Sequence, residues 1–384
     1  MPSATILGPY LGNQHFSIDN YFNYCVQSAE GLPLSWTVRG LRPGGCDPSH
    51  FVHDCVPRRQ AWKDVYFDWP KTLRQMNTDL YHIVDHGLAW YKMFLRQGKT
   101  IITVHDLINV LVMNGNLSLP PIPARRQIII NLCIEQIKKA DALICVSTKT
   151  ASDVMSVLGI SSQRISVIHN IVPPIFKPLG AGEREAARKK LHGSVEHVVL
   201  HVGKPSPYKN RIGAIQIFDI VHSQLPDSKL VLTSQKLTHE EESFLSERAC
   251  AKSVLVYRPE TQDALHNLYC TADVFLFPSV SEGFGWPPVE AMACGCPVVT
   301  SCGGALGETV GDGGISFDNP NDFGAFANAA VQILKSPDLS SELRAKGLSH
   351  VRKYSRDMLA PRLVELYKQI GNSAHEHSAR PAIA

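Results

Sequence analysis

Residues 277–293 read Phe277-Pro278-Ser279-Val280-Ser281-Glu282-Gly283-Phe284-Gly285-Trp286-Pro287-Pro288-Val289-Glu290-Ala291-Met292-Ala293. The stretch joins the end of an apolar strand to a helix through a glycine-rich loop. Proline is tolerated in the first helical turn, because the N–H that it lacks has no partner within the helix. Glu282 lies in the loop and Glu290 in the first turns of the helix. Both carboxylates are therefore expected at the carboxyl end of a strand, where open α/β sheets bind ligands.

The chemistry of this pair points to a ligand with two kinds of group. A helix start preceded by glycines attracts anions. Carboxylates would repel a nearby phosphate, but they are good acceptors for hydroxyl groups. A ligand that is polyhydroxylated at one end and anionic at the other, such as a sugar nucleotide, fits both halves. The alternative is a capped helix that carries two solvated glutamates.

Composition narrows the class of protein. A length of 384 residues predicts two domains, and 38 basic against 35 acidic residues give a net charge of +3. This mild basicity suits an anionic substrate or loose contact with an anionic membrane surface. Aromatic residues do not alternate with a basic stripe, so nucleic-acid binding is not indicated. No apolar run reaches the ~18 residues of a membrane span, and the N-terminus lacks a signal-peptide pattern.

The ten cysteines are scattered along the chain, and only Cys294 and Cys296 stand close together. No metal-type spacing is present. Cys133, Cys145 and Cys270 lie in apolar runs and are interpreted as small buried hydrophobic residues. This pattern predicts a reducing, cytoplasmic compartment.

Strand-like runs alternate with helical patterns, which predicts parallel sheets with crossover helices. Each half of the chain is predicted to form its own doubly wound sheet, with a proline-rich break at residues 171–180. The predicted domains are 1–175 together with a crossover helix at about 356–371, then 176–355, then a disordered tail at 372–384. The predicted strands are 4–8, 34–38, 80–84, 100–104, 142–146, 165–168, 198–202, 229–232, 253–256, 272–277, 297–300 and 314–317.

Further candidates follow other predicted strands. Lys204 and Lys209 flank a turn after residues 198–202 and could hold a diphosphate, the alternative being two solvated lysines. Gly12 belongs to a glycine-rich turn after the first strand, which could face a ligand but lacks the dinucleotide fingerprint. His105 ends another strand and is assigned a ligand role over a structural one. Gly303 and Gly304 would allow close backbone approach to a ligand.

Together these residues resemble the retaining glycosyltransferases of family 4, which have the GT-B fold. That fold is α/β, with two Rossmann-like doubly wound domains that face across a cleft and a C-terminal helix that crosses back to the N-terminal domain. The resemblance covers almost the whole chain and is strongest at residues 199–318. The E-x7-E motif of the family matches Glu282 and Glu290.

The resemblance implies a role for each matching residue. Glu282, His105 and Lys209 would form the catalytic group, with Glu282 at the sugar, His105 at the sugar and the β-phosphate region, and Lys209 at the diphosphate. The remaining donor-binding residues would be Lys204, Gly283, Phe284, Gly285 and Glu290, with Glu290 at the nucleotide ribose. The family commonly has arginine where Lys204 stands, so a point charge replaces a bidentate fork. Trp286 stands where leucine or isoleucine is more usual.

The implied activity is retaining transfer of a hexose, with mannose as one candidate, from a nucleoside-diphosphate sugar to a glycan or lipid-linked glycan. The setting would be bacterial surface polysaccharide synthesis, with peripheral contact at the inner membrane face. Neither a metal nor a cofactor is expected beyond the donor substrate. Two alternatives remain open: a GT-B-fold sugar-nucleotide epimerase or hydrolase, and a non-catalytic nucleotide-sugar-binding protein.

Overall fold

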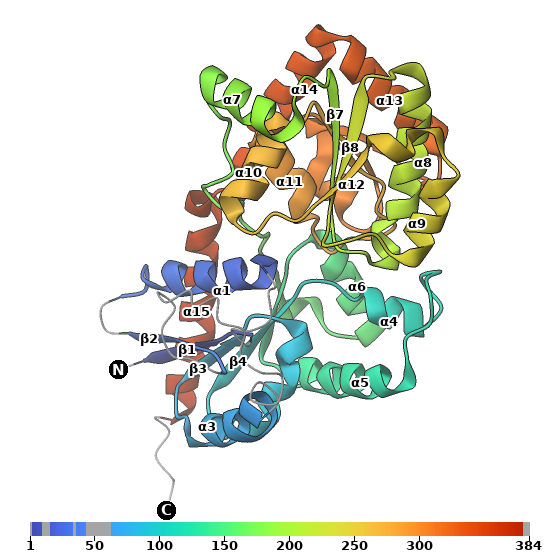
Figure 1. Ribbon diagram of the computed structural model, residues 1–384. Coiled ribbons are helices and arrows are strands. Elements are labelled where there is room, and N and C mark those ends of the chain that lie inside the picture. The colour runs from blue at the N-terminus through green and yellow to red at the C-terminus, as the bar shows by residue number, and fades with distance from the viewer. Residues whose placement is uncertain (1, 10–15, 34–35, 44–62, 379–384) are drawn as a thin grey trace, which may run out of the picture. The chain divides into compact units, whose positions relative to one another are not determined.

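The computed structural model describes residues 2–9, 16–33, 36–43 and 63–378 (Figure 1). The chain divides into two compact units. The first consists of residues 1–171 and 356–384, and the second of residues 172–355. The sequence placed the first boundary at 175/176, whereas in the structure it lies between Ile171 and Val172.

The first unit is built on a six-stranded parallel sheet with the order β2-β1-β3-β4-β5-β6. Every residue of β3 and β5 is buried. Helices cover both faces of such a sheet, which is why its strands are continuous apolar runs in the sequence. The strands are β1 (Ser3–Leu7), β2 (Thr37–Leu41), β3 (Leu80–Ile83), β4 (Lys99–Val104), β5 (Ala142–Cys145) and β6 (Ile165–Val167).

Helices connect these strands. In α6, the Ser147 side chain caps the N-terminus by accepting a hydrogen bond from the Thr150 N–H, and Gly159 ends the helix with φ 68°. The helices of this unit are α1 (Phe16–Ala29), α3 (Trp69–Gln75), α4 (Ile108–Met113), α5 (Ala124–Lys138), α6 (Thr148–Leu158) and α15 (Arg356–Ser378), with short turns η1 (Asp64–Asp68), η2 (His86–Phe94) and η3 (Ser162–Arg164).

The second unit has a six-stranded parallel sheet with the order β12-β11-β10-β7-β8-β9. The chain starts at β7, continues outward to β9, then returns to build β10 to β12 on the other side. The strand order therefore reverses between β7 and β10, which makes that point the expected ligand crevice. The strands are β7 (His197–Val202), β8 (Ser228–Thr233), β9 (Val254–Tyr257), β10 (Val274–Phe277), β11 (Val298–Ser301) and β12 (Ile315–Phe317).

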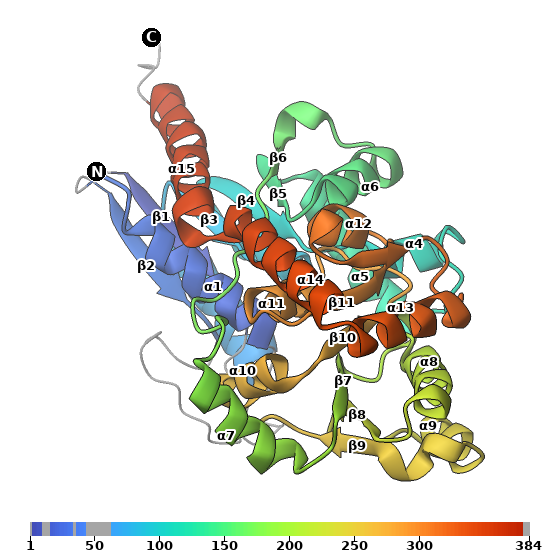
Figure 2. The ribbon, with the colours of Figure 1, turned by 90° about the horizontal axis from the view of Figure 1, so that it is seen from above.

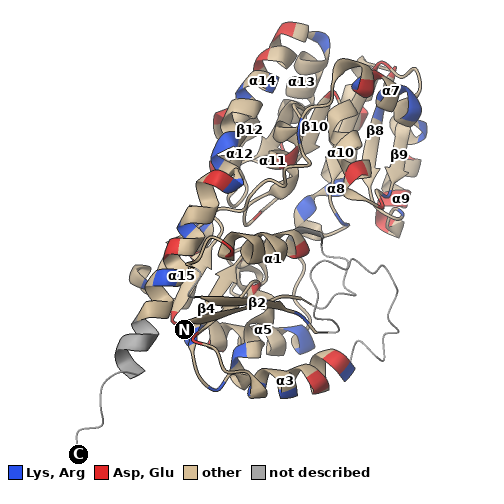
Figure 3. Cartoon of the chain, turned by 90° about the vertical axis from the view of Figure 1, so that its left-hand side faces the viewer, with Lys and Arg blue, Asp and Glu red and all other residues tan. Residues whose placement is uncertain are grey.

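Amphipathic helices cover this second sheet. α8 and α13 lie side by side and contribute Phe218, Val221, Phe326 and Ala330 to the core (Figure 2). Acidic and basic residues are interspersed along the helices of each unit (Figure 3). The helices are α7 (Ala181–His192), α8 (Arg211–Gln224), α9 (His239–Ser246), α10 (Gln262–Thr271), α11 (Trp286–Ala293), α12 (Leu306–Val310), α13 (Phe323–Lys335) and α14 (Pro337–His350), with short turns η4 (Pro207–Lys209), η5 (Ala249–Ser253), η6 (Gly311–Gly313) and η7 (Val351–Tyr354).

A buried polar network attaches the last helix, α15, to the first unit. His82 on β3 lies between two hydroxyls, with Nδ1 2.6 Å from Tyr367 Oη on α15 and Nε2 2.7 Å from Thr103 Oγ1 on β4. Tyr21 Oη on α1 is 3.0 Å from the same Thr103 oxygen. Burial lowers the pKa of His82 to about 3, so the ring is neutral. The predicted return of the C-terminal helix to the N-terminal domain is thus confirmed.

The last helix extends into the segment 372–384 that was predicted to be a tail. The helix α15 continues to Ser378, and residues 379–384 lie outside the described residues. The composition after Asn372 is small and polar, which suggested disorder. A helix that is already formed needs no new nucleus, so such residues can extend it.

Further elements differ from the sequence prediction, β2 and α7 among them. β2 spans Thr37–Leu41 where residues 34–38 were predicted, and residues 34 and 35 of that prediction lie outside the described residues. Helix α7 was not predicted. It buries only His192, so it lacks the apolar periodicity by which amphipathic helices are recognised.

Candidate active site

Two loops meet at the carboxyl ends of β7 and β10, where the strand order reverses. The Tyr208 carbonyl, in the loop after β7, is the acceptor that joins them. It accepts a hydrogen bond from Val280 N at 2.7 Å and lies 2.8 Å from Ser279 Oγ, both in the loop after β10. Loops that are separate in the sequence are therefore fixed to one another beside Lys209 and Glu282.

Lys209 is positioned by an unusual backbone conformation at the next residue. Asn210 has φ 48°, a left-handed conformation that asparagine tolerates better than most residues. Its side chain caps α8 by accepting from Gly213 N at 3.3 Å. A Cβ atom at Gly213 would lie 2.6 Å from that side chain, so the cap requires glycine there.

Lys209 and Glu282 form a nearly buried ion pair. Lys209 Nζ is 2.7 Å from Glu282 Oε1, and the two side chains are 12% and 10% exposed. Ser279 Oγ also lies 2.7 Å from Oε1, and its single hydrogen serves either this oxygen or Tyr208 O. Lys209 Nζ lies 4.8 Å from the centre of the Phe277 ring, a cation–π contact. Because both charged groups are largely removed from water, each one depends on the other for compensation of its charge.

The glycine loop after β11 supports Glu282 through its backbone. Ala305 N donates to Glu282 O at 2.8 Å, and Gly304 pairs with Glu282 as an isolated parallel bridge. A Cβ on Gly304 would lie 2.2 Å from Glu282 O, and one on Gly303 would lie 2.3 Å from Val280 O. The predicted close approach exists, but the backbone that these glycines meet is that of the Glu282 loop.

Glu290 occupies a different environment. Its Oε2 accepts a 2.9 Å hydrogen bond from Tyr269 Oη on α10. Burial raises the pKa of Glu290 to about 7, while the Tyr269 hydrogen bond and the Lys209 charge act in the opposite direction. This carboxyl group thus titrates near neutrality.

The start of α11 offers fewer N–H groups than a helix without proline. Pro287 and Pro288 carry none, so any anion must be met by N–H groups that precede them. Gly285 has φ 86°, and a Cβ there would lie 2.4 Å from Leu306. The Phe284 ring packs on Tyr354, with 5.2 Å between ring centres, and its carbonyl oxygen accepts a hydrogen bond from Thr309 Oγ1 at 2.7 Å.

His105 follows β4 in the first unit and is 8% exposed. Its Nε2 donates to Val84 O at 2.9 Å, and the Tyr21 ring lies edge-on at 5.0 Å. Burial lowers the pKa of His105, so its ring is neutral, with Nδ1 as the accepting nitrogen. His105 N donates to His86 Nδ1 at 3.3 Å, which places a second histidine beside it.

The remaining candidates differ in their exposure and in whether the structure describes them. Lys204 lies exposed in the loop after β7, in contrast to the enclosed Lys209, and Gly283 lies in the Glu282 loop. Gly12 lies outside the described residues. Sequence reasoning missed Ser279 and Tyr269, the neutral partners of the two glutamates. Ser279 could have been found, because it precedes Glu282 by three residues in the same loop. Nothing in the sequence connects Tyr269 to Glu290.

Two family models match consecutive parts of the chain. The model described as Glycosyltransferase Family 4 matches residues 40–175, and that described as Glycosyl transferases group 1 matches residues 183–350. The chain belongs to the family 4 glycosyltransferases.

Curated relatives of this family member include bacterial mannosyltransferases. The O-antigen chain mannosyltransferase B of Escherichia coli is 26% identical over 316 residues, which cover 81% of this chain and 77% of the relative. The serotype-specific mannosyltransferase WbdA of Escherichia coli is 27% identical over 290 residues, or 74% of this chain. The chain spans only 35% of the length of WbdA.

Solved structures share the fold over nearly the whole chain. The sucrose-phosphate synthase of Thermosynechococcus elongatus matches with a TM-score of 0.74 at 18% identity, covering 97% of this chain and 100% of that one. WaaG, a glycosyltransferase involved in lipopolysaccharide biosynthesis, matches with a TM-score of 0.72 at 14% identity, covering 95% and 99%. The predicted GT-B fold is confirmed.

The mutual dependence of Lys209 and Glu282 can be tested by substituting each residue alone and both together. Lys209→Met leaves the Glu282 carboxylate without its cation, and Glu282→Gln leaves the ammonium without its anion. Each single variant is expected to lower the free energy of unfolding by about 3 kcal/mol. The double variant should recover most of that loss, because no uncompensated charge remains. Urea denaturation of the four proteins measures the coupling, and purely additive losses would contradict it. The exposed pair Lys346–Glu342 provides a control in which Lys346→Met should change nothing measurable.

Proposed function

We propose that this chain is a retaining hexosyltransferase that moves a sugar from a nucleoside-diphosphate donor to a glycan or lipid-linked glycan acceptor in bacterial surface polysaccharide synthesis. The observation that carries the proposal is the Lys209–Glu282 pair at the switch point between β7 and β10. It combines a cation for a diphosphate with a carboxylate for sugar hydroxyls, at the edge where such sheets bind ligands.

Related proteins support the class of substrate. The O-antigen chain mannosyltransferase B and WbdA are named as mannosyltransferases. HepE of Anabaena was solved in complex with UDP-glucose and matches with a TM-score of 0.71 at 15% identity, covering 96% of this chain and 100% of that one. A nucleotide-sugar donor is therefore proposed, with mannose as the first candidate for the sugar.

The proposed mechanism uses charges already present in the protein. The Lys209 ammonium has three N–H groups, so it can hold Glu282 and still donate to the leaving diphosphate. With Lys204 and loop N–H groups it would stabilise the leaving charge without a divalent metal. Glu282 would orient the sugar and stabilise positive charge that develops on it. In a front-face reaction the leaving phosphate takes the acceptor proton, which requires no separate general base.

The protonation of His105 restricts its role. Its Nε2–H is used on Val84 O, so Nδ1 can only accept a hydrogen bond. An accepting nitrogen suits a sugar hydroxyl and repels an anionic phosphate oxygen. His105 is thus proposed to orient the transferred sugar.

Transfer is tested by incubating the protein with GDP-mannose, UDP-glucose or UDP-N-acetylglucosamine, each with and without a lipid-linked oligosaccharide acceptor. We expect one donor to be consumed only with acceptor, to give a product with retained anomeric configuration by NMR. Lys209→Ala and Glu282→Gln should each lower kcat/KM at least about 100-fold. Near-normal transfer by both variants would contradict the assignment of Lys209 and Glu282 to the active site.

The arms of this assay separate the alternatives. Donor consumption without acceptor would indicate an epimerase or hydrolase, and binding without turnover would indicate a nucleotide-sugar-binding protein. Brief treatment with EDTA should leave the initial rate unchanged. Loss of activity that added magnesium or manganese restores would contradict the proposed metal independence.

The raised pKa of Glu290 makes donor binding depend on pH. If the ionised form accepts ribose hydroxyls, the competent fraction rises as pH rises through about 7 and is lost as pH falls. The Kd for the donor should therefore be about tenfold weaker at pH 6 than at pH 8. A nucleotide sugar itself does not titrate in this window. Calorimetric titration measures the effect, and Glu290→Gln should bind more weakly with a flat profile. An unchanged pH dependence in this variant would refute the role.

Helix α5 supports contact with an anionic membrane surface. Ile128, Ile129 and Leu132 are 70%, 51% and 38% exposed, and Arg125 and Arg126 are exposed on the same helix. Exposed apolar residues beside basic ones favour anionic lipid surfaces. No described helix is long and apolar enough to cross a membrane. Contact would thus be peripheral, at the cytoplasmic face.

Sedimentation with phosphatidylcholine vesicles, with and without phosphatidylglycerol, tests this contact. Ile128→Ser with Ile129→Ser should weaken binding at least about tenfold, since each buried isoleucine contributes about 1.5–3 kcal/mol. Met358→Ser is a matched control, because Met358 is 60% exposed on a different helix, α15. Equal binding by all three proteins, or no preference for anionic vesicles, would overturn the proposal.

A further inference from the structure

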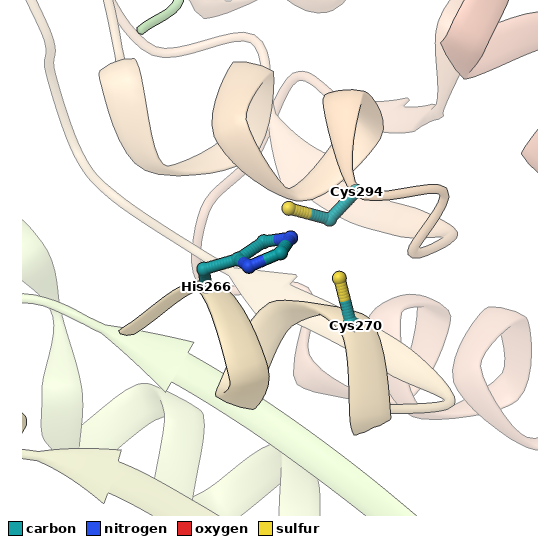
Figure 4. Close-up of side chains that lie close together, drawn as sticks. All are labelled: His266, Cys270 and Cys294. Carbon is teal, nitrogen blue, oxygen red and sulfur yellow. The ribbon is translucent and has the colours of Figure 1, made fainter. Parts of the chain in front are cut away.

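One histidine and two cysteines, residue types that commonly bind metal ions, lie close together inside the second unit. His266 and Cys270 lie one turn apart on α10, and Cys294 lies at the end of α11 (Figure 4). One ligand atom from each lies within 4.8 Å of the others. The residues are only 7%, 3% and 2% exposed. The sequence showed no metal-type spacing because the third residue comes from a different helix.

A backbone carbonyl completes the group. Lys177 O lies 2.6 Å from His266 Nε2 and 3.3 Å from Cys270 Sγ, and it accepts a hydrogen bond from each. One oxygen, one imidazole and two thiols thus converge in an interior from which water is largely excluded. Buried thiols that only fill space need no such common acceptor.

We propose that His266, Cys270 and Cys294 bind a zinc ion, with Lys177 O as the fourth ligand. Imidazole nitrogen and thiolate sulfur are the ligands that zinc prefers in proteins, and four protein ligands are typical of a structural site. Binding releases the two thiol protons to solvent. With Nε2 as the ligand atom, the imidazole proton resides on Nδ1. No change of oxidation state occurs.

The position of the site gives the ion a structural role. Cys270 directly follows Tyr269, and Cys294 N donates to Glu290 O at 3.0 Å. The ion would therefore join α10, α11 and the segment around Lys177, which together hold the Tyr269–Glu290 hydrogen bond. It would position Glu290 without touching a substrate. This role is independent of the proposed metal-free transfer chemistry.

The test measures metal in protein purified without chelator. We expect about one zinc per chain by mass spectrometry. After stripping, added Zn²⁺ should raise the Tm by at least about 5 °C at 100 times the Kd. Added Co²⁺ should produce the sulfur-to-cobalt charge-transfer absorption that reports thiolate ligands. None of these measurements requires sugar transfer, so they stand whether or not the proposed activity is correct.

Variants identify the ligands. Cys270→Ala and Cys294→Ala should each lose the bound zinc and the cobalt absorption. Cys296→Ala is the matched control and should retain both, because Cys296 is also 2% exposed but lies outside the group. Circular dichroism establishes that each variant is folded. Absence of stoichiometric zinc in the wild type, together with no Tm shift by Zn²⁺, would overturn the site. Loss of the ion in Cys296→Ala alone would overturn the ligand set.

Discussion

The pairing of Lys209 with Glu282 is the contact on which the candidate site depends. The two residues are 73 positions apart and belong to loops after different strands. Neither charge is stable at 12% and 10% exposure without the other. Their partnership therefore requires the loops after β7 and β10 to stay together. The Tyr208 carbonyl provides that attachment through its contacts with the loop after β10, and Gly303 and Gly304 bring the loop after β11 against the backbone of Glu282.

The two glutamates of one motif lie in different environments because their partners differ. Glu282 faces a cation, whereas Glu290 faces the neutral Tyr269 hydroxyl in an apolar interior. Eight residues of sequence thus separate a compensated carboxylate from one with a pKa of about 7. His201 lies buried on β7, and burial lowers its pKa to about 3, so it adds no charge beneath the loops. His201 therefore adds nothing to the positive charge that Lys209 and Lys204 offer to a diphosphate.

Much of the fold could be predicted because parallel strands buried on both faces leave a strong signal. Each strand of both sheets overlaps a predicted strand, and the bounds differ most at β2, which spans Thr37–Leu41 where 34–38 was predicted. Helices were less visible where they bury little. α7 is rich in helix-forming residues but buries only His192, so a search for apolar periodicity misses it. The end of α15 shows the converse, since polar composition by itself does not stop a helix that tertiary contacts have already nucleated.

The candidate site residues could be predicted where a motif fixes the spacing of side chains. They could not be predicted where the partner is a group that only the folded chain brings close. Glu282 and Lys209 could be chosen as candidates from loops after strands and Glu290 from the helix that follows, but the carbonyl of Tyr208 is a backbone atom that no residue type encodes. The same distinction applies to His266 and Cys270, whose spacing of four places both on one face of a helix. Cys294 joins them only because the chain crosses through β10 and returns along the neighbouring helix α11. In a parallel α/β unit, consecutive helices on one face repeatedly bring together residues about 25 positions apart. This fold can therefore bring together ligand residues that lie about 25 positions apart in the sequence. Motif rules based on short spacing do not detect such sets.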